Sequence, residues 1–415
     1  MWDAKKVMLL RFSSYGFLKN LKFFEPFLYL FFLANGLSFT QIGILISIRE
    51  VSTIVLELPT GVVADLTGRR RAMATAFFCY MISFSIFYYY SLFLIFIPAM
   101  FLFAMGETLR HGTHKSMIMQ YLDNEGMEDQ RVRYYGKTRA ASRLGSALSA
   151  VIAGAIVYFV GNYNIIFLAT LVPYSFAFVL MLTYPKELDG EPEGASIIST
   201  WNHLKNSFKQ LYKHAGLGKM LVNASVYDSF FKISKDYLSP IIETLAVALP
   251  MLMFIEYEQQ RTAILVGVIY FFVYINSFTS SIKSASFMEK VGDMGKALDM
   301  LYFLMAGLFL VVAISLQFNL IEISIITFFF FYTLYNLRKP MVIGFVGDRM
   351  DSQTRATLFS GQNLLRSVVG MIIAPILGYL ADTMGISYAF LFGAVVLVVV
   401  GIILPISDKI KVIKT

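Results

Sequence analysis

The sequence predicts an all-α, polytopic membrane protein, and three observations lead to this fold class: the composition, the long apolar runs and the placement of basic residues. Of the 415 residues, 57% are hydrophobic and 15% are charged, whereas soluble globular chains average about 45–50% apolar and about 25% charged. A transmembrane helix needs about 20 apolar residues, so this length accommodates about twelve of them with short connections. Sizeable domains outside the membrane are therefore excluded.

Apolar runs separated by polar breaks predict the transmembrane helices in order. They lie at residues 9–34, 41–64, 72–90, 93–120, 134–160, 164–184, 217–246, 263–285, 297–317, 322–347, 358–382 and 388–406. We expect a six-helix bundle at 1–184, a cytoplasmic linker at 185–216 and a second six-helix bundle at 217–415.

The linker is expected to contain an amphipathic helix on the inner membrane surface. Its apolar residues recur at helical spacing and would form one face of a helix: Ile197, Trp201, Leu204, Phe208 and Leu211. Its lysines, Lys205, Lys209 and Lys213, lie off that face. A calmodulin-like target site is the alternative. A plain interfacial helix is favoured, because basic amphipathic stretches bind anionic lipid.

Basic residues collect on one side of the predicted membrane. Arg69, Arg70 and Arg71 follow the second helix, on the same side as the N-terminus, whereas the segments on the opposite side carry only Arg261. Cytoplasmic loops are enriched in Lys and Arg, so both termini are predicted to be cytoplasmic. The net charge of +8 thus reports topology, and no nucleic-acid partner is expected.

Several chemistries lack the residues they need. The single cysteine, Cys79, permits neither an intrachain disulfide nor a thiolate metal cluster. No Gly-x-x-x-x-Gly-Lys-Ser/Thr loop for nucleotides is present, and neither is a motif for an intramembrane hydrolase. The basic start runs into an apolar stretch too long for a cleavable signal peptide. We expect no enzyme activity and no cofactor.

The two halves of the chain resemble each other in sequence. Gly136 and Gly145 in the fifth helix match Gly361 and Gly370 in the eleventh, with the same spacing at a displacement of 225 positions. The loop after the second helix has a weaker counterpart after the eighth, where Asp293 and Met294 stand in place of arginines. Such echoes indicate an internal duplication of a six-helix unit in parallel orientation.

The loop after the second helix carries the clearest motif, Gly61-Val-Val-Ala-Asp65-Leu-Thr-Gly68-Arg69-Arg70-Arg71. This spacing resembles the signature loop of the major facilitator superfamily, and the twelve helices and the 6+6 repeat agree with it over essentially the whole chain. An ordinary positive-inside turn would explain the arginines but not Gly61 and Asp65.

The resemblance implies a fold of two six-helix bundles related by a pseudo-twofold axis, with a small solute bound between them. It also implies that Gly61, Asp65, Gly68, Arg69 and Arg70 act as a cytoplasmic gating loop. Gly68 permits a tight turn, and the arginines can pair with carboxylates. Leu66 departs from the basic residue that the family usually has there.

Ionisable residues inside membrane spans are costly, so we interpret them as lining an interior cavity for the solute. The candidates are Lys22, Glu25, Arg49, Glu50, Glu107, Arg110, Arg143, Asp228, Lys232, Asp236 and Arg366. The alternative for each is an internal ion pair that holds helices together. Glu25, Glu107 and Asp228 are the candidates for proton coupling, because burial favours a protonated carboxyl group.

Basic groups outnumber acidic ones in these spans, which favours an anionic solute. The family resemblance implies Lys22 and Lys232 as its partners. Other basic residues near the inner ends, such as Lys115, Arg139 and Lys339, could instead extend to lipid phosphates.

Glu107, His111 and His114 fall on one stripe of the predicted fourth helix, and all three residue types can bind metals. The neighbouring Arg110 and Lys115 oppose a cation. No metal site is expected, and polar contacts or a proton relay remain the open alternatives for the histidines.

These features predict a secondary transporter in the inner or plasma membrane. It would move a small solute by alternating access, coupled to a proton or sodium gradient, with a preference for organic anions or amphipathic compounds. A proton-coupled efflux antiporter is one alternative, although the fifth helix lacks the proline of the export motif. A non-transporting receptor or scaffold is another, and the short tails disfavour it. We expect a monomer.

Overall fold

The computed structural model describes residues 4–190, 215–347 and 352–406, and these residues form helices with no β-strand among them. The predicted all-α fold is confirmed. The amphipathic stretch expected from Ile197 to Lys213 lies outside the described residues.

The chain forms two compact units. Unit 1 comprises Met1–Asn35, Ser52–Thr200 and Leu252–Tyr274, and unit 2 comprises Gly36–Val51, Trp201–Met251 and Ile275–Thr415. Two helices, α3 (Phe39–Thr67) and α12 (Glu258–Ile282), are therefore divided between the units. The first part of α3 belongs to unit 2 and its second part to unit 1, whereas the first part of α12 belongs to unit 1 and its second part to unit 2. The division into bundles at 184 and 217 stays a prediction.

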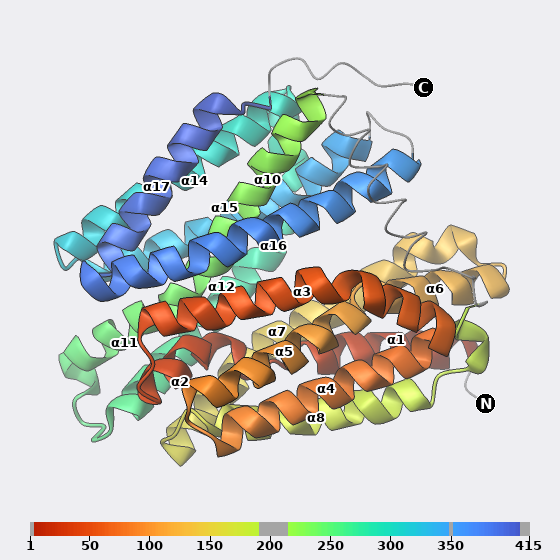
Figure 1. The fold of residues 1–415 in the computed structure, drawn as a ribbon, viewed down its shortest axis with the longest axis horizontal. Helices are drawn as coiled ribbons and strands as arrows, with labels where there is room; N and C mark the ends of the chain where they lie inside the picture. Colours follow the sequence, from red (N-terminus) through yellow and green to blue (C-terminus); the bar gives the residue numbers. More distant parts are fainter. Residues whose placement is uncertain (1–3, 191–214, 348–351, 407–415) are drawn as a thin grey trace. The chain divides into compact units, whose positions relative to one another are not determined.

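Unit 1 is built mainly from the first half of the chain (Figure 1). Within it, α4 packs against α5 and α8, and α1 packs against α7. Its elements are α1 (Ala4–Lys19), η1 (Glu25–Phe27), α2 (Leu28–Ala34), α4 (Arg69–Tyr89), α5 (Phe93–Arg110), α6 (Thr113–Asn124), η2 (Glu128–Gln130), α7 (Arg131–Val160), α8 (Ile165–Leu182) and η3 (Lys186–Leu188), with parts of α3 and α12.

Unit 2 repeats this packing scheme. Within it, α14 packs against α15 and α17, and α10 packs against α16, so corresponding helices of the predicted repeat have corresponding neighbours. Its elements are α10 (Ala215–Ser234), η4 (Lys235–Tyr237), α11 (Leu238–Ala248), α13 (Ser284–Val291), α14 (Met294–Gln317), α15 (Ile321–Gly347), α16 (Ser352–Thr383) and α17 (Ile386–Ile403); η5 (Pro250–Leu252) lies at the unit boundary.

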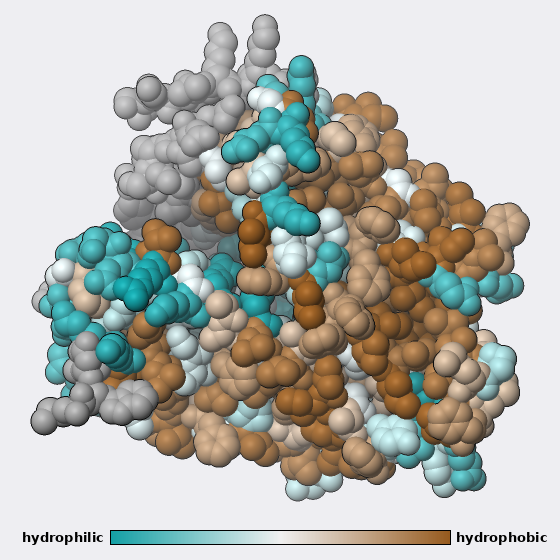
Figure 2. Space-filling view, turned by 180° about the vertical axis from the view of Figure 1, so that it is seen from behind, coloured by the Kyte–Doolittle hydropathy of each residue, from teal (hydrophilic) through white to brown (hydrophobic). Residues whose placement is uncertain are grey.

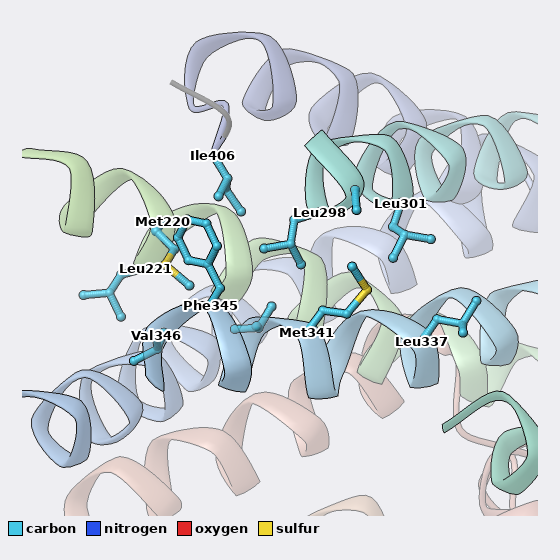
Figure 3. Packing of buried hydrophobic residues seen from close by; sticks show 11 residues of the cluster. Met220, Leu221, Leu298, Leu301, Leu337, Met341, Phe345, Val346 and Ile406 are labelled. Atoms are coloured by element: carbon cyan, nitrogen blue, oxygen red, sulfur yellow. The ribbon is translucent and has the colours of Figure 1, made fainter. Parts of the chain in front are cut away.

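A tightly packed apolar cluster holds α10, α14 and α15 together in unit 2 (Figure 3). Met220 and Leu221 come from α10, and Leu298 and Leu301 come from α14. Met341 and Phe345 of α15 and Ile406, which follows α17, complete this part of the cluster. Lipid is as apolar as these side chains, so close van der Waals packing stabilises such contacts between helices.

Nine segments among the described residues are long and apolar enough to cross a membrane. Hydrophobic side chains cover much of the face shown in Figure 2. Large apolar residues are exposed along these helices, for example Leu94 at 73%, Phe159 at 81% and Ile402 at 67%. Such exposure is costly in water and favourable against lipid, which identifies an integral membrane protein.

Three predicted helices are interrupted, which corrects the continuous spans expected at 9–34, 93–120 and 217–246. The first breaks between α1 and η1, where Pro26 cannot donate a backbone hydrogen bond. The seventh breaks at η4, just before Pro240. Pro240 has no backbone N–H to donate to the Asp236 carbonyl, and Ser239 Oγ donates to that carbonyl at 3.3 Å in its place. The fourth breaks at Gly112, whose φ is +78°.

Helices α3 and α16 approach closely within unit 2 because glycines line their contact. A Cβ atom added to Gly43 would lie 2.4 Å from the Ala374 carbonyl oxygen, and one added to Gly378 would lie 2.2 Å from that of Phe39. In unit 1, Gly154 of α7 similarly meets Ala263 of α12. Small residues permit such backbone contact between membrane helices.

Candidate functional site

The most deeply buried carboxylate of the candidate set, Glu50, lies at the centre of an ionic cluster in unit 2. Its side chain is 3% exposed. Lys232 Nζ of α10 lies 2.6 Å from Glu50 Oε1, and Ser367 Oγ of α16 donates to Oε2 at 2.9 Å. Arg49 adds a third donor at 3.0 Å. These contacts join three helices, and they compensate the buried charge by pairing and hydrogen bonding.

A second polar site, the Asp228 pocket, is a cavity of about 110 Å³ between α10, α15 and α16. Asp228 accepts a hydrogen bond from Gln362 Nε2 at 3.1 Å. Three cationic side chains share the lining with this one carboxylate. The full lining is Asp228, Arg338, Lys339, Val342, Ile343, Phe359, Gln362, Asn363 and Arg366.

Arg338 is the most buried of these cations, with 1% of the residue exposed. Its guanidinium donates to Asn223 Oδ1 at 2.7 Å and lies over the Tyr227 ring, with Cζ 4.2 Å from the ring centroid. Arg338 Cζ also lies 5.5 Å from the centroid of the Tyr302 ring. Cation–π contacts and an amide hydrogen bond thus hold the guanidinium in place. Nε has no hydrogen-bond partner among the described residues.

Unit 1 holds a separate ionic network around Glu107. Arg110 NH2 donates to both carboxylate oxygens, at 3.0 and 2.9 Å, and the Tyr80 hydroxyl donates to Oε1 at 2.5 Å. Lys22 and Glu25 form a longer pair, with 3.9 Å between Nζ and Oε2. The hydroxyl of Tyr80 also accepts from Arg110 Nε at 3.2 Å, which closes the network.

The two histidines do not extend this network as one helical stripe. The break at Gly112 separates Glu107 and Arg110 on α5 from His114 on α6, so the stripe expected from the sequence is wrong. His114 stacks on Tyr15, with 3.7 Å between ring centroids, and its Nε2 lies 3.2 Å from the Tyr184 hydroxyl. Within the described ranges, no group of three metal-ligating side chains is found.

The remaining cavity candidates are not among the lining residues of the Asp228 pocket. Asp236 of η4 pairs with its neighbour Lys235 at 2.6 Å, and Arg143 is half-buried on α7 in unit 1. Of the predicted residues, only Asp228 and Arg366 line the pocket.

Sequence reasoning did not select several residues that build these sites. Tyr80, Asn223 and Gln362 are ordinary polar residues whose roles depend on neighbours from other helices. Arg338 and Lys339 carried a usable signal, because they are ionisable residues inside a predicted span.

The gating loop expected at Gly61–Arg71 folds around a tight turn at Gly68, where φ is +91°. Asp189, directly after η3, accepts hydrogen bonds from Arg70 N at 2.8 Å and Arg70 Nε at 3.2 Å. Arg70 NH1 also donates to the Tyr184 carbonyl at 2.9 Å. The loop is thus tied to the start of the linker within unit 1. The side chain of Asp65 lies outside the described residues.

Comparison with known proteins gives a consistent family assignment. The profile of the family described as Major Facilitator Superfamily matches residues 7–375. A curated Bacillus subtilis (strain 168) protein, described as the uncharacterized MFS-type transporter YxaM, is 21% identical over 418 residues, covering 96% of each chain.

Solved transporter structures share the fold at low sequence identity. The nucleoside transporter NupG aligns with a TM-score of 0.73 at 13% identity, covering 97% of this chain and 99% of that one. A D-xylose-proton symporter aligns with a TM-score of 0.71 at 11% identity, covering 99% of both. The peptide transporter POT, in complex with sulfate, also reaches 0.71, at 13% identity, covering 96% of this chain and 93% of that one.

Proposed function

This chain belongs to the Major Facilitator Superfamily, and from that premise we propose that it moves a small organic anion or amphipathic solute by alternating access, driven by the proton gradient. Members of this family are transporters and not enzymes, and the chain is an integral protein of the plasma membrane.

One observation carries the coupling part of the proposal: Asp228 lines a pocket without an ion pair of its own among the described residues. Its side-chain hydrogen-bond partner in the described part of the chain is the neutral Gln362. Glu50 and Glu107, in contrast, each contact a cation at 3.0 Å or less. A proton on Asp228 changes the charge of the pocket without breaking an existing ion pair, so proton binding and solute binding can influence each other.

Glu107 and Glu25 are the secondary coupling candidates of the proposal. Protonation of Glu107 would leave Arg110 without its carboxylate partner and would alter the network with Tyr80. The D-xylose-proton symporter of the same fold supports proton coupling as the first hypothesis.

Reconstituted protein tests this function. Proteoliposomes with an imposed pH gradient should accumulate a radiolabelled organic anion such as benzyl phosphate, and the direction of flux relative to the gradient distinguishes import from export. Asp228→Asn should abolish gradient-driven accumulation while leaving exchange between labelled and unlabelled solute, because exchange requires no net proton movement.

Glu322→Gln is the matched control, since Glu322 is exposed in the first turn of α15 and distant in sequence from the pocket. Its accumulation should equal that of the wild-type protein. Full accumulation by Asp228→Asn would contradict the coupling role, and binding without exchange in the wild-type protein would favour a receptor over a transporter.

A further inference from the structure

We infer that the Asp228 pocket of unit 2 binds the oxyanion group of the solute, a carboxylate or a phosphate, with Arg338, Lys339 and Arg366 as its cationic partners. This inference rests on the proposed transport function and names the charge type and the subsite. The sequence counts Arg338 among the basic residues inside the predicted spans, but the family resemblance names Lys22 and Lys232, and not Arg338 or Lys339, as partners of the solute.

The charge balance of the pocket is the first argument. Three cationic side chains face one carboxylate, which leaves an excess of two positive charges. None of Arg338, Lys339 and Arg366 forms an ion pair with a carboxylate in the described part of the chain. Arg338 is buried, whereas Arg366 is half-buried and Lys339 is exposed, so the cost of uncompensated charge at low dielectric falls mainly on Arg338. An anionic ligand removes that cost.

The placement of unused hydrogen-bond donors is the second argument. Arg338 Nε and Arg366 Nε are both buried, and neither has a hydrogen-bond partner among the described residues. Guanidinium groups recognise carboxylates and phosphates through paired N–H donors. Both arginines line the pocket, so an oxyanion there would satisfy donors that are otherwise orphaned.

Preorganisation is the third argument. Asn223, Tyr227 and Tyr302 hold the Arg338 guanidinium before any ligand arrives. These contacts stabilise the group without neutralising its charge, since amides and aromatic rings carry no formal charge. A fixed, charged and partly unsatisfied arginine binds a ligand with little loss of side-chain entropy.

The uncharged lining residues of the pocket indicate which other chemical groups the solute carries. Val342, Ile343 and Phe359 are apolar and lie on the same pocket as the cations. Gln362 and Asn363 add neutral amides. This combination suits an organic anion with an apolar body better than a bare inorganic ion.

The two lysines expected from the family resemblance are less suited to this role. Lys232 Nζ lies 2.6 Å from Glu50 Oε1 and so already compensates a buried carboxylate. Lys22 pairs with Glu25 at 3.9 Å. Each must leave an existing partner before it can hold an anion, whereas the pocket cations need not.

Equilibrium binding tests the inference independently of transport. Purified protein in phosphatidylcholine nanodiscs is titrated by calorimetry with benzyl phosphate, benzyl alcohol and benzylamine, which share one apolar body and differ in charge. Benzyl phosphate should bind, and the alcohol and the amine should bind at least about tenfold more weakly. Equal binding of all three compounds would overturn the inference.

Variants that remove a positive charge from the pocket are compared with one that removes its negative charge. Arg366→Gln and Arg338→Gln should each weaken benzyl phosphate binding about tenfold or more, whereas Asp228→Asn should strengthen it, because it removes the one negative charge of the pocket. Arg139→Gln is the control: Arg139 is exposed on α7, where it contacts Tyr135, and its loss should leave affinity unchanged. If Arg338→Gln fails to fold, Arg366→Gln and Asp228→Asn still decide the question.

A lipid phosphate could supply the same chemistry, and a second arm separates the two sources. Nanodiscs with phosphatidylglycerol are compared with nanodiscs of phosphatidylcholine alone. Unchanged benzyl phosphate affinity supports a soluble ligand, and loss of binding only with phosphatidylglycerol would overturn the inference in favour of a lipid ligand.

The pocket and the proton coupling can fail separately. Binding without proton-driven flux would contradict the proposed coupling alone, and flux without this binding would contradict the pocket alone.

Discussion

At the scale of single residues, the buried charges of unit 2 fall into two kinds. Glu50 has three donors around it, including Lys232 and Ser367, and is fully compensated. Arg338 is at least as buried, and among the described residues its guanidinium contacts the neutral amide of Asn223 and two tyrosine rings, with no ion pair to a carboxylate. A compensated charge holds helices together, whereas an uncompensated one is available for a ligand.

Removal of Lys232 should therefore affect stability more than solute recognition. Lys232→Met leaves Glu50 buried with Arg49 and Ser367 as remaining donors, and loss of one partner of a buried pair costs about 3–5 kcal/mol. We expect about 3 kcal/mol because two donors remain. Chemical unfolding in mixed micelles measures this loss.

The double variant Glu50→Gln with Lys232→Met should recover most of the lost stability, since no unpaired charge is then buried. Additive effects of the two substitutions would show that the pair does not interact.

The small size of Gly378 permits the close contact between α3 and α16. Gly378→Ala would place a Cβ atom 2.2 Å from the Phe39 carbonyl oxygen, so α3 and α16 must move apart, at a cost of about 1–3 kcal/mol. Gly307→Ala on α14 is the matched control, because nothing lies within 4 Å of its added Cβ. The control should be neutral or stabilising by up to about 1 kcal/mol. Thermal unfolding followed by size-exclusion chromatography compares the two, and equal melting temperatures would refute tight packing at Gly378.

At the scale of elements, one helix end is capped by another helix. Asp382, near the end of α16, accepts hydrogen bonds from Phe39 N at 2.9 Å, Thr40 N at 2.7 Å and Thr40 Oγ1 at 2.6 Å, at the start of α3. A carboxylate at a helix N-terminus satisfies free N–H groups and interacts favourably with the helix dipole. Asp382 thereby fastens the first half of α3 within unit 2.

Asp382→Ala should loosen this helix end, with a loss of about 1 kcal/mol. In protein carrying Ser38→Cys, maleimide labelling should become several-fold faster, because Ser38 directly precedes α3. Asp293→Ala is the control, since Asp293 caps α14 through Lys296 N and not α3. Identical labelling rates in both variants would contradict the capping role.

At the scale of the whole molecule, the predicted gating loop and the segment directly after η3 are joined by hydrogen bonds within unit 1. Asp189 binds both the backbone and the side chain of Arg70. If the loop acts as a gate, as proposed from the motif, this contact helps to set how readily the loop changes its conformation.

Asp189→Asn should therefore change the transport rate several-fold while leaving the solute dissociation constant unchanged, since Asp189 does not line the Asp228 pocket. Glu187→Gln, two residues earlier and exposed, is the control. Initial rates in proteoliposomes measure the effect, and Asp65→Asn in the same loop should also slow or bias the cycle. Wild-type kinetics in both Asp189→Asn and Asp65→Asn would count against a gating role of the loop.

Much of the fold is predictable from the sequence because hydrophobicity acts locally along the chain. A run of about 20 apolar residues must form a helix in lipid, whatever its neighbours are. The family could be identified for a similar reason, since Gly61, Gly68 and Arg69 form a short local pattern. The interruptions at Pro26 and Gly112 were visible as residue types, but proline and glycine also occur inside continuous membrane helices, so the breaks themselves were not predictable.

By itself, the sequence determined that this chain is an all-helical membrane transporter of the Major Facilitator Superfamily, and it named the ionisable residues inside the spans. Only the tertiary structure decided which of these charges are compensated. Lys232 and Glu50 are 182 positions apart, and Arg338 and Asn223 are 115 apart. Whether such residues meet depends on the rotation and depth of separate helices, which side-chain packing sets and which no local pattern records.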